Sequence, residues 1–411
     1  MRAGSRVTSF VHAIHKLGLD CPRVRILFCN YEYPPLGGGG GVVMASLARE
    51  LAKRHEVTVL TSRAGELPAL SDESGVRVVR VPVVFRAALD TANFPSMLAY
   101  LPAAAWRASR MRRGESFDVV NTHFVVPTGP AGQWIAERFR IPNVLSVHGG
   151  DLYDPSKKLS PHRHGWLRRP IQRLLRRADA VIAQSTNTRD NVREIYGVDR
   201  SVGLIPLGID RPPSIDRVPA SAFGLPPGAF TIVTIGRLVA RKQTTQLVGA
   251  IAASGVANAH LLVVGGGPDA EPIRRAAAEH GIADRVHLLG RLENADKYRV
   301  LAAADLFAST SQHEGFGLVF LEAMAFGLPV ICYDHGGQTD YLETGRTGYV
   351  LKLDDAIAFA GAIRAVAESA DRGRETGENN RRLVEQYFID RCAERYEAEF
   401  SRAIAAHRRT M

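Results

Sequence analysis

Residues 314–329 read EGFGLVFLEAMAFGLP, and the rest of the chain can be arranged around this stretch. It begins with a carboxylate in a glycine-containing turn, and an almost entirely apolar segment follows at 318–326. Gly327 and Pro329 end that segment, because neither residue continues a helix well. The pattern predicts a short helix that is apolar on every face, and such a helix is expected to be buried.

Glu322 is the one charge inside this predicted helix and needs hydrogen-bond donors if it is buried. Gly317 allows a close turn before the helix, and the free N–H groups of Leu318 and Val319 suit an anion such as phosphate. Glu322 follows about 6 Å further along the axis, which is near the offset between the diphosphate and the ribose of a nucleotide. The alternative is structural, with Glu314 as an N-cap and Glu322 paired with arginines.

Length and composition indicate a two-domain globular protein. A chain of 411 residues is too long for one ordinary core, and 45% hydrophobic with 23% charged residues excludes a disordered chain. The net charge of +10 suits nucleic acid, anionic lipid or small anionic substrates, and it does not choose among them.

The cysteines and the N-terminal segment point to a reducing, cytoplasmic location. No Cys-x-x-Cys pair occurs, so we expect buried thiols and neither a disulfide framework nor a zinc site. No run approaches the roughly 18 apolar residues of a membrane span. Residues 1–22 lack the apolar core of a secretory signal, and we interpret them as an extension. The four cysteines are Cys21, Cys29, Cys332 and Cys392.

The first predicted domain covers residues 23–208 and begins with a βαβ unit. A strand at 24–29, the five glycines 37–41, a helix at 42–54 and a strand at 56–61 follow one another. The glycine-rich loop could bring backbone N–H groups close to phosphate, or it could be a plain flexible loop. Further strands are expected at 76–81, 117–122, 143–147 and 180–183. Strands that alternate with helices predict a parallel, doubly wound sheet.

His148 follows the strand at 143–147 and precedes two glycines. A single histidine is more often structural than catalytic, but this one lies at the carboxyl edge where such sheets bind ligands. Two basic stretches also belong to this domain: 97–114 contains Trp106 and four arginines, and 160–177 contains six arginines and no acidic residue. Each is interpreted either as a surface that docks on an anionic membrane or as the solvated face of an ordinary helix.

The second predicted domain covers residues 209–388 and begins with a proline-rich linker at 211–227. Its expected strands lie at 230–235, 260–264, 285–289, 305–310, 330–333 and 345–351. Several of them end in glycine or charge on the presumed ligand edge, which supports a ligand site more than any single loop does. The strand-end residues are Gly236, Arg237 and Lys242, then Gly265, Gly266 and Gly267, then Arg291. We expect the last segment, 389–411, to cross back onto the first domain.

These features suggest that a nucleoside-diphosphate donor binds in the second domain. They are a helix start suited to phosphate, a carboxylate placed to bind the ribose, and two cations. Arg237 and Lys242 would neutralise the charge that grows on a leaving diphosphate, a role otherwise taken by a metal ion. The sequence contains no Asp-x-Asp pair, which favours a metal-free site.

The sequence resembles the retaining glycosyltransferases of family 4, whose GT-B architecture is an α/β fold with two Rossmann-like, doubly wound domains facing a central cleft. The resemblance covers nearly the whole chain from Val24 onward. Its most specific part is the Glu-x7-Glu motif, present as Glu314 and Glu322. Around it stand the Gly236–Lys242 segment, the loop of three glycines, the Pro34-Pro35 loop with its glycines, and His148.

The resemblance implies a hexosyl transfer from a UDP- or GDP-sugar to a hydroxyl of a glycan or lipid-linked acceptor, with retention of configuration and without a cofactor. The catalytic residues would be His148, Glu314, Arg237 and Lys242. The donor would be bound by Gly39, Gly40, Gly41, Gly236, Gly265, Gly266, Gly267, Arg291, Phe316, Gly317, Leu318, Val319 and Glu322. Peripheral association with the inner face of an anionic membrane is expected, and nucleic acid is not expected as a partner.

Two departures from the family pattern concern this site. Gln243 follows Lys242 where the family often has glycine, and Asp340 stands where a glutamate is usual, which leaves the local sugar or acceptor contacts open. A nucleotide-sugar epimerase of the same architecture and, more remotely, a basic nucleic-acid-binding protein are the competing functions. The base, the sugar and the acceptor are not specified by the sequence.

Overall fold

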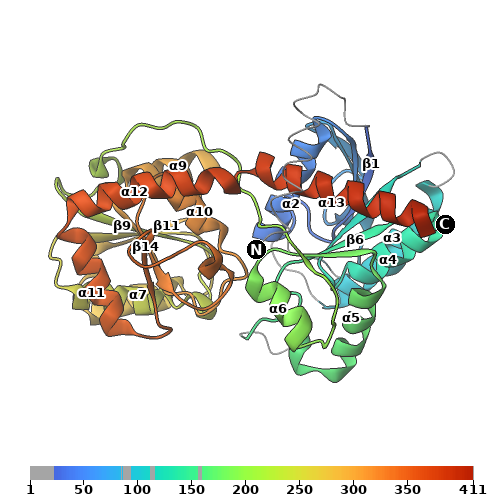
Figure 1. Ribbon diagram of the computed structural model, residues 1–411. Coiled ribbons are helices and arrows are strands. Elements are labelled where there is room, and N and C mark those ends of the chain that lie inside the picture. Colours follow the sequence, from blue (N-terminus) through green and yellow to red (C-terminus); the bar gives the residue numbers. More distant parts are fainter. Residues whose placement is uncertain (1–22, 85, 87–93, 112–115, 156–159, 411) are drawn as a thin grey trace.

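The computed structural model describes residues 23–84, 86, 94–111, 116–155 and 160–410. The chain forms two α/β lobes that lie side by side, each with its own sheet (Figure 1). The expected extension at residues 1–22 lies outside the described residues. So does part of the basic stretch 97–114.

The first lobe contains an eight-stranded sheet in the order β3-β4-β2-β1-β5-β6-β7-β8. All of its neighbouring strands run parallel except β3, which is antiparallel to β4. The sequence analysis missed β3, because its residues Leu-Ser-Asp-Glu carry no apolar run. The strands are β1 (Arg25–Cys29), β2 (Glu56–Arg63), β3 (Leu70–Glu73), β4 (Val76–Pro82), β5 (Val119–His123), β6 (Asn143–Val147), β7 (Ala180–Ala183) and β8 (Gly203–Leu204).

The second lobe contains a six-stranded, all-parallel sheet in the order β11-β10-β9-β12-β13-β14. Each strand lies within a few residues of its predicted position, because these strands are short and mostly apolar runs, and the four central ones are buried on both faces. The strands are β9 (Phe230–Ile235), β10 (Ala259–Val264), β11 (Val286–Gly290), β12 (Leu306–Ser309), β13 (Val330–Tyr333) and β14 (Gly348–Leu351).

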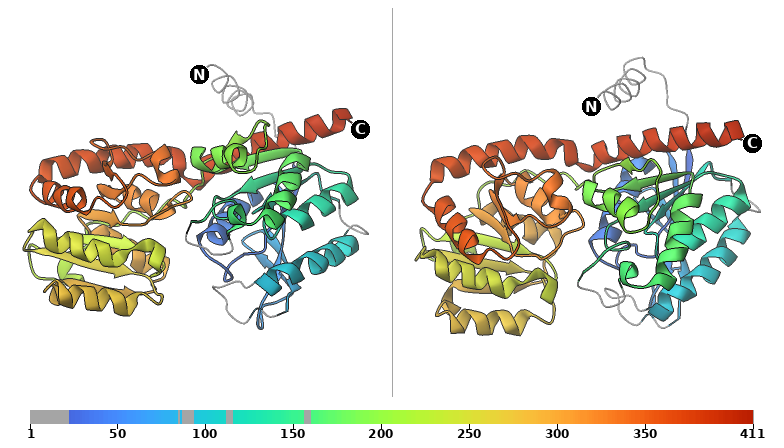
Figure 2. Two further views of the ribbon diagram at one scale, coloured as in Figure 1. Left: turned by 90° about the horizontal axis from the view of Figure 1, so that it is seen from below. Right: turned by 60° about the horizontal axis from the view of Figure 1, so that its bottom comes forward.

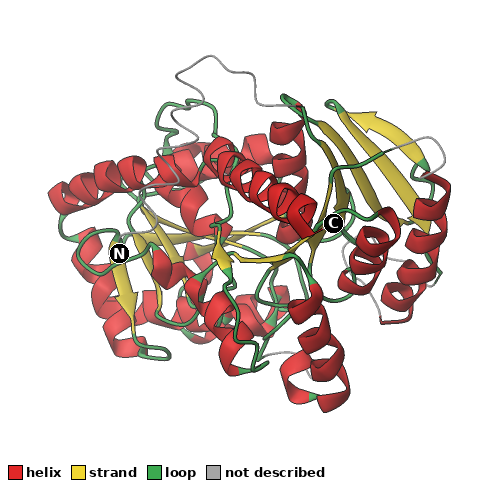
Figure 3. Ribbon diagram, turned by 45° about the vertical axis from the view of Figure 1, so that its right-hand side comes forward, coloured by secondary structure: helices red, strands yellow, loops and turns green. Residues whose placement is uncertain are grey.

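Helices cover both sheets, as expected for doubly wound domains (Figure 3). The α/β GT-B fold class predicted from the sequence is therefore confirmed. The helices are α2 (Gly39–Ala52), α3 (Phe94–Met111), α4 (Gly129–Phe139), α5 (Gly165–Arg177), α6 (Thr186–Glu194), α7 (Thr244–Ser254), α8 (Ala270–Glu279), α9 (Asn294–Ala303), α10 (Leu318–Ala325), α11 (Ala356–Ala367), α12 (Ala370–Val384) and α13 (Ile389–Thr410).

Helix α13 joins the two lobes. It follows α12 of the second lobe and runs along the first lobe (Figure 2). Its apolar side chains, including Tyr396 and Phe400, belong to the same buried cluster as Phe28 of β1. Where the chain enters α13, Ile209 accepts a hydrogen bond from the N–H of Ile389 and donates one to Tyr387. The interlobe linker and the return segment therefore lie side by side and are hydrogen-bonded.

The described cysteines, Cys29, Cys332 and Cys392, are buried free thiols, and Cys21 lies outside the described residues. Burial raises the pKa of Cys29 and of Cys392 to about 12, so these thiols are protonated and unreactive at neutral pH. Over the part of the chain that is described, no helix is both long and apolar enough to cross a bilayer.

Candidate active site

The strand order of each sheet reverses at one point, and ligands of doubly wound sheets bind beyond the carboxyl ends of the strands at such a point. In the first sheet the reversal lies between β1 and β5, and in the second it lies between β9 and β12. The segment after β9 contains Arg237 and Lys242, and the segment after β12 leads to Glu314 and α10. These are the residues that the sequence analysis selected.

The starts of α2 and α10 face each other across the two lobes. A methyl group placed on Gly39, the first residue of α2, would lie 3.7 Å from the side chain of Leu318, the first residue of α10. The glycines 39–41 were predicted as part of a loop, and this prediction is wrong: they form the first turn of α2. Gly40 needs its lack of a side chain, because the ring of Phe124 occupies the space a Cβ would take.

The turn before α10 depends on Gly317, whose φ of 83° is left-handed and whose Cβ would collide with the ring of Phe320. The Tyr341 hydroxyl donates to the carbonyls of Phe316 and Gly317, at 2.7 and 2.8 Å, and so holds the turn in place. The Phe316 ring is buried against Tyr341. Only its backbone, and not its side chain, could contact a ligand.

Glu314 lies beside two cationic side chains at the centre of the site. Lys242 donates a hydrogen bond to one of its oxygens, and an Arg241 nitrogen lies 3.7 Å from the other. Burial would raise the pKa of the Glu314 carboxyl, but the charges of Lys242 and Arg241 outweigh burial and lower that pKa. Glu314 is therefore ionised, and two cations lie beside it. Arg241 also donates to the carbonyl of His313, which fixes its position.

The loop of three glycines after β10 packs against the backbone that follows β9. A Cβ on Gly265 would overlap the Gly236 carbonyl, and one on Gly267 would overlap the backbone of Leu238. Arg291 lies along Gly266, with its Nε 3.3 Å from a hypothetical Cβ there. Close packing against the backbone therefore explains why positions 265 and 267 are glycine, independently of any bound nucleotide base. Arg237 is exposed at the same edge of the sheet.

Glu322 is paired with a lysine that the sequence analysis did not select. The Lys297 ammonium, on α9, donates to Glu322 Oε1 at 2.8 Å, and both side chains are largely buried. The sequence analysis required a donor for Glu322 and considered arginines. Lys297 belongs to a helix with mostly exposed polar neighbours, and nothing in its local sequence distinguishes it from a surface lysine.

His148 is buried at the end of β6, and its ring stacks on Phe124 at 4.2 Å. Burial lowers the pKa of His148 to about 4, and the nearby Gln184 side chain opposes this effect in part. The imidazole is therefore neutral at pH 7. The backbone N–H of His148 donates to the Asp151 carboxylate, and the Gln184 amide donates to the backbone carbonyl of His148 at 2.8 Å.

The His148 loop touches the Glu314 turn directly. A Cβ on Gly149 would lie 3.3 Å from the Cα of Gly315, and Ser185 donates to the Gly315 carbonyl at 3.2 Å. Asp340 closes the same boundary, because its carboxylate accepts from both the N–H and the hydroxyl of Thr186. Thr186 begins α6, so Asp340 lies at a helix N-terminus, where a negative charge is favourable. The two lobes therefore meet at the candidate site.

Two stretches of the chain match known glycosyltransferase families. Residues 37–211 match the family described as Glycosyltransferase Family 4, and residues 220–383 match Glycosyl transferases group 1. The D-inositol 3-phosphate glycosyltransferase of Nocardia farcinica is 30% identical over 364 residues, covering 83% of this chain and 79% of that protein. This chain belongs to glycosyltransferase family 4. The family predicted from the sequence is thereby confirmed.

Two other proteins are similar to this family-4 glycosyltransferase over most of its length. The N-acetyl-alpha-D-glucosaminyl L-malate synthase of Bacillus anthracis is 28% identical over 399 residues, or 93% of this chain and 95% of that protein. The solved structure of Anabaena Alr3699/HepE in complex with UDP has a TM-score of 0.73 and 22% identity, covering 91% and 98% of the two chains. At that identity the likeness supports the GT-B fold alone.

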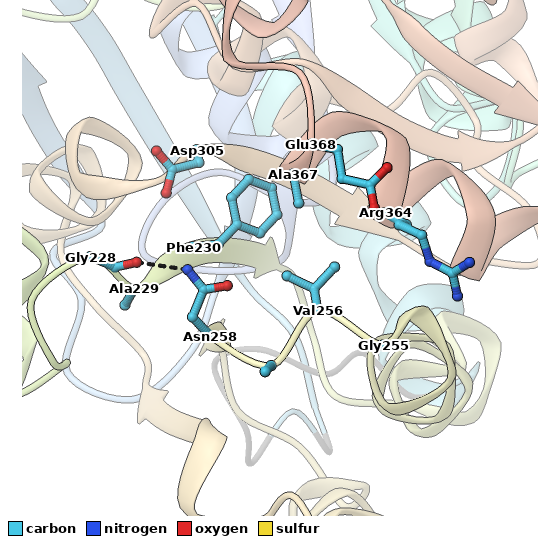
Figure 4. Close-up of a pocket in the computed structure, with 11 residues that line it drawn as sticks. Gly228, Ala229, Phe230, Gly255, Val256, Asn258, Asp305, Arg364, Ala367 and Glu368 are labelled. Carbon is cyan, nitrogen blue, oxygen red and sulfur yellow. Dashed lines mark hydrogen bonds between the residues drawn. The ribbon is translucent and has the colours of Figure 1, made fainter.

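The glycosyltransferase also has a hollow far from this site, at the opposite edge of the second sheet (Figure 4). It has a volume of about 440 Å³ and lies around Phe230, Asp305 and Arg364, where β9 begins rather than ends. We do not assign the reaction to it, because none of the residues around Glu314 or His148 lines it. Among the described residues, no group of three or more His, Cys, Asp or Glu side chains could hold a metal ion.

Proposed function

We propose that this glycosyltransferase transfers a hexosyl group from a UDP-sugar to a hydroxyl group of its acceptor, with retention of configuration and without a metal ion. GDP is the second candidate for the nucleotide. UDP is favoured because the solved relative of similar fold, HepE, was crystallised with it.

The main support for the proposal is a group of oppositely charged side chains near the start of α10. Lys242 and Arg241 flank Glu314, and the first N–H groups of α10 follow a few residues later. A diphosphate would lie between the cations and the helix start, where backbone donors and the helix dipole favour negative charge. Glu314 would then bind hydroxyls of the donor sugar, and Glu322 the ribose. Arg237, exposed at the end of β9, would reach the diphosphate from the other side.

The reaction would proceed on one face of the sugar. The bond between the anomeric carbon and the diphosphate oxygen breaks, and the acceptor oxygen forms a bond to the same carbon on the same face. The proton of the acceptor hydroxyl passes to the leaving diphosphate, so no separate general base is required. Lys242 and Arg237 would stabilise the charge that develops on the diphosphate. Glycines 39–41, at the start of α2, would cover the phosphates from the first lobe.

A ligand panel tests the donor. UDP, GDP and ADP, with and without sugars, are added to the protein while thermal unfolding is followed, since a ligand that binds only the folded state raises the melting temperature. We expect the largest shift with a uridine nucleotide, a smaller shift in Glu322→Gln, and an unchanged one in Arg274→Met, whose arginine pairs with Glu271 on the surface of α8. A shift confined to guanosine or adenosine nucleotides would replace UDP by that donor.

Product analysis tests the chemistry. The anomeric configuration of the product is determined by NMR and compared with that of the donor, in buffer with and without EDTA. We expect the same configuration in both and turnover that EDTA does not change. An inverted product contradicts retention, and loss of turnover in EDTA that is restored by a divalent ion contradicts a metal-free reaction. Epimerised free nucleotide sugar without an acceptor would indicate an epimerase.

We further propose that the first lobe docks on an anionic membrane, where a lipid-linked acceptor enters. All three tryptophans of the sequence, Trp106, Trp134 and Trp166, are exposed, although tryptophan is usually well buried. They lie on α3, α4 and α5, which are neighbours in the first lobe. Trp166 contacts Phe94, which is also exposed, so α3 and α5 share an aromatic patch.

Arginines accompany this aromatic patch. The Arg110 guanidinium lies 3.5 Å above the Trp106 ring, and α5 exposes Arg168, Arg169, Arg173, Arg176 and Arg177. Aromatic side chains with arginines are suited to the boundary between anionic headgroups and acyl chains. A solvated arginine face would explain the charges but not the exposed tryptophans.

Vesicle sedimentation tests the docking. We expect the protein to sediment with vesicles that contain phosphatidylglycerol at physiological salt and not with phosphatidylcholine vesicles, and Trp106→Ser/Trp166→Ser to lose most of this binding. Ile357→Ser is the matched control, because Ile357 is an exposed apolar residue on the second lobe. Equal recovery of wild type with and without anionic vesicles contradicts the proposal.

A further inference from the structure

A line of hydrogen bonds runs from His148 into the first sheet. The His148 Nε2 lies 2.9 Å from Nδ1 of His123, the last residue of β5, and His123 Nε2 lies 2.7 Å from Oδ1 of Asn121. Asn121 in turn donates to the carbonyl of Val144 at 2.9 Å and to the hydroxyl of Ser146 at 3.0 Å. Every side chain in this line is buried.

The backbone carbonyl of Val144, at the end of this chain of hydrogen bonds, determines which atom donates in each of them. A backbone carbonyl can only accept, so the NH2 group of Asn121 must face Val144, and its oxygen must face His123. The Asn121 oxygen can only accept as well, so His123 carries its proton on Nε2. Its Nδ1 then has a lone pair, and His148 must donate to it from Nε2. For a neutral imidazole this leaves His148 Nδ1 without a proton.

His148 Nδ1 is therefore a hydrogen-bond acceptor, and no group donates to it among the described residues. It is buried and has no hydrogen-bond partner among the described residues, and the same holds for the side-chain oxygen of Gln184. The Gln184 amide is anchored on the His148 carbonyl at 2.8 Å. Two buried acceptors near one loop are unfavourable unless a donor group binds there.

We propose that Asn121 and His123 are positioning residues that hold His148 in the Nε2-protonated form, so that its Nδ1 accepts a hydrogen bond from a hydroxyl of the bound sugar or acceptor. The proposal rests on the proposed transferase function for the identity of the hydroxyl. It does not need that function for the tautomer, which follows from the line of bonds itself. His148 is then neither a general base nor a donor to the leaving group.

Histidine NMR tests the tautomer without any turnover. The protein is labelled with 15N-histidine, and long-range 1H–15N correlation spectra distinguish protonated from bare ring nitrogens. Signals are assigned with His148→Asn and His123→Phe. We expect both rings of the wild type at pH 7 to carry the proton on Nε2. A proton on Nδ1 of His148, or a cationic ring, overturns the proposal even if UDP-sugars are turned over.

Variants at His123 test its consequence for the reaction. His123→Phe keeps a flat ring between Phe28 and Tyr396 but removes the acceptor for His148. His123→Asn places an oxygen on the atom that follows Cβ, as Nδ1 is placed in histidine, and can accept again. We expect His123→Phe to lower kcat/KM about tenfold, the effect of one hydrogen bond. We expect His123→Asn to recover most of this loss and to return the His148 spectrum to the wild-type form.

The control is His287→Phe, which removes one ring of another stacked histidine pair, His260 and His287, in the second lobe. It should leave both the His148 spectrum and kcat/KM unchanged. If His123→Phe is as active as the wild type, or if His123→Asn loses as much activity as His123→Phe while both remain folded, the positioning role is wrong. If no nucleotide sugar is turned over by the wild type, the transferase proposal fails and the NMR result still decides this one.

Discussion

Lys242 and Glu314 are hydrogen-bonded to each other although they are 72 positions apart in the sequence. Lys242 follows β9 and Glu314 follows β12, and these two strands are neighbours at the point where the second sheet reverses its order. The pair is 10 to 14% exposed, and Arg241 lies beside it. The sheet topology therefore brings together, at one edge, the charges that the sequence supplies from two distant loops.

Replacement of Lys242 by methionine should lower both turnover and stability. The Glu314 carboxylate would lose its closest cation, and a diphosphate would lose one of the charges that stabilise it. We expect kcat to fall about 100-fold and the free energy of unfolding to fall by about 2 kcal/mol, because the buried carboxylate loses its hydrogen-bonded cation and keeps the more distant Arg241. Initial rates and urea unfolding measure the two effects.

The double variant Lys242→Met/Glu314→Gln separates the two effects. With both charges removed, the stability loss should be smaller than in Lys242→Met alone, whereas turnover should not recover. Arg274→Met serves as the control for loss of a cation at the surface. Turnover of Lys242→Met within twofold of wild type would contradict the role assigned to this lysine.

Glu322→Gln should weaken binding of the donor more than it slows the chemical step. Glu322 would contact the ribose, which does not react, so its loss removes binding that ground state and transition state share. We expect KM for the nucleotide sugar to rise about tenfold, with kcat changed by less than a factor of about three. Steady-state kinetics over a range of donor concentrations gives both values.

Lys297→Met provides the matched comparison, because it removes the cation that holds Glu322 at 2.8 Å without removing the carboxylate. Its KM should change less than that of Glu322→Gln. An equal rise in both variants would mean that the pair has only a structural role.

Gln243→Gly should stabilise the protein. Gln243 has a φ of 45° and a ψ of 39°, which is the left-handed conformation that glycine adopts without strain. This explains why glycine is usual at this position in the family, as noted from the sequence. We expect the free energy of unfolding to rise by about 0.5 to 1 kcal/mol, seen as a higher urea midpoint with an unchanged m-value.

Gln243→Ala is the control, because it removes the same side chain but keeps the Cβ. It should give no gain. If alanine stabilises as much as glycine, the side chain rather than the backbone conformation is the cause.

The sequence predicted the fold class and most strands because their signals are local. Runs such as 230–235 and 330–333 are short, apolar and bounded by glycine or charge, and they are the strands β9 and β13. β3 was missed because its pairing with β4 comes from the hairpin turn and not from its own composition. The start of α2 was misplaced because three glycines indicate a loop by propensity, whereas here they form the first turn of a helix, in which the ring of Phe124 leaves no room for a side chain at Gly40.

The candidate site was predicted only in part, because side chains that are far apart in the sequence give no local sign that they will be in contact. Glu314 and Glu322 are recognisable by their spacing, but Lys297 and His123 have no comparable pattern. His123 could have been selected, because it ends β5 at the same sheet edge as His148 ends β6. Lys297 could not, because only the packing of α9 against α10 turns a surface lysine into the partner of a buried carboxylate.

Asp340→Ala should loosen the contact between the lobes at the start of α6. The Asp340 carboxylate accepts from the N–H of Thr186 at 2.7 Å and from its hydroxyl, and no backbone group replaces these bonds. We expect amide hydrogen exchange in the first turn of α6 to quicken by about tenfold, the effect of about 1.4 kcal/mol. Exchange in the first turn of α7, in the second lobe, is the internal control.

Asp340→Glu, which restores the residue usual in the family, distinguishes charge from length. If it exchanges like the wild type, the carboxylate alone is needed at this helix start. An unchanged exchange rate in Asp340→Ala would show that the contact contributes nothing to closure of the lobes.

Stability should fall as the pH is lowered from about 6.5 to 5, because buried histidines, His123, His148 and His313 among them, resist protonation. Burial lowers the pKa of His148 to about 4, and burial with the nearby His335 and Arg241 lowers that of His313 to about 4. Burial and the neighbouring His148 lower the pKa of His123 well below its usual value. Between the unfolded pKa near 6.5 and the folded value, the unfolded chain binds more protons, so the free energy of unfolding decreases with falling pH. Each histidine contributes a slope of up to about 1.4 kcal/mol per pH unit in this window.

Urea unfolding at several pH values between 7.5 and about 5 measures the slope, and it avoids the lower range in which Glu314 also titrates. His148→Asn should reduce the slope by up to about 1.4 kcal/mol per pH unit, because the contribution of His148 is lost. His280→Asn, which replaces an exposed histidine after α8, should leave it unchanged. A wild-type slope of zero above pH 5 would mean that these buried rings gain protons in the folded state, and the neutral His148 on which the chain of hydrogen bonds depends would then be wrong.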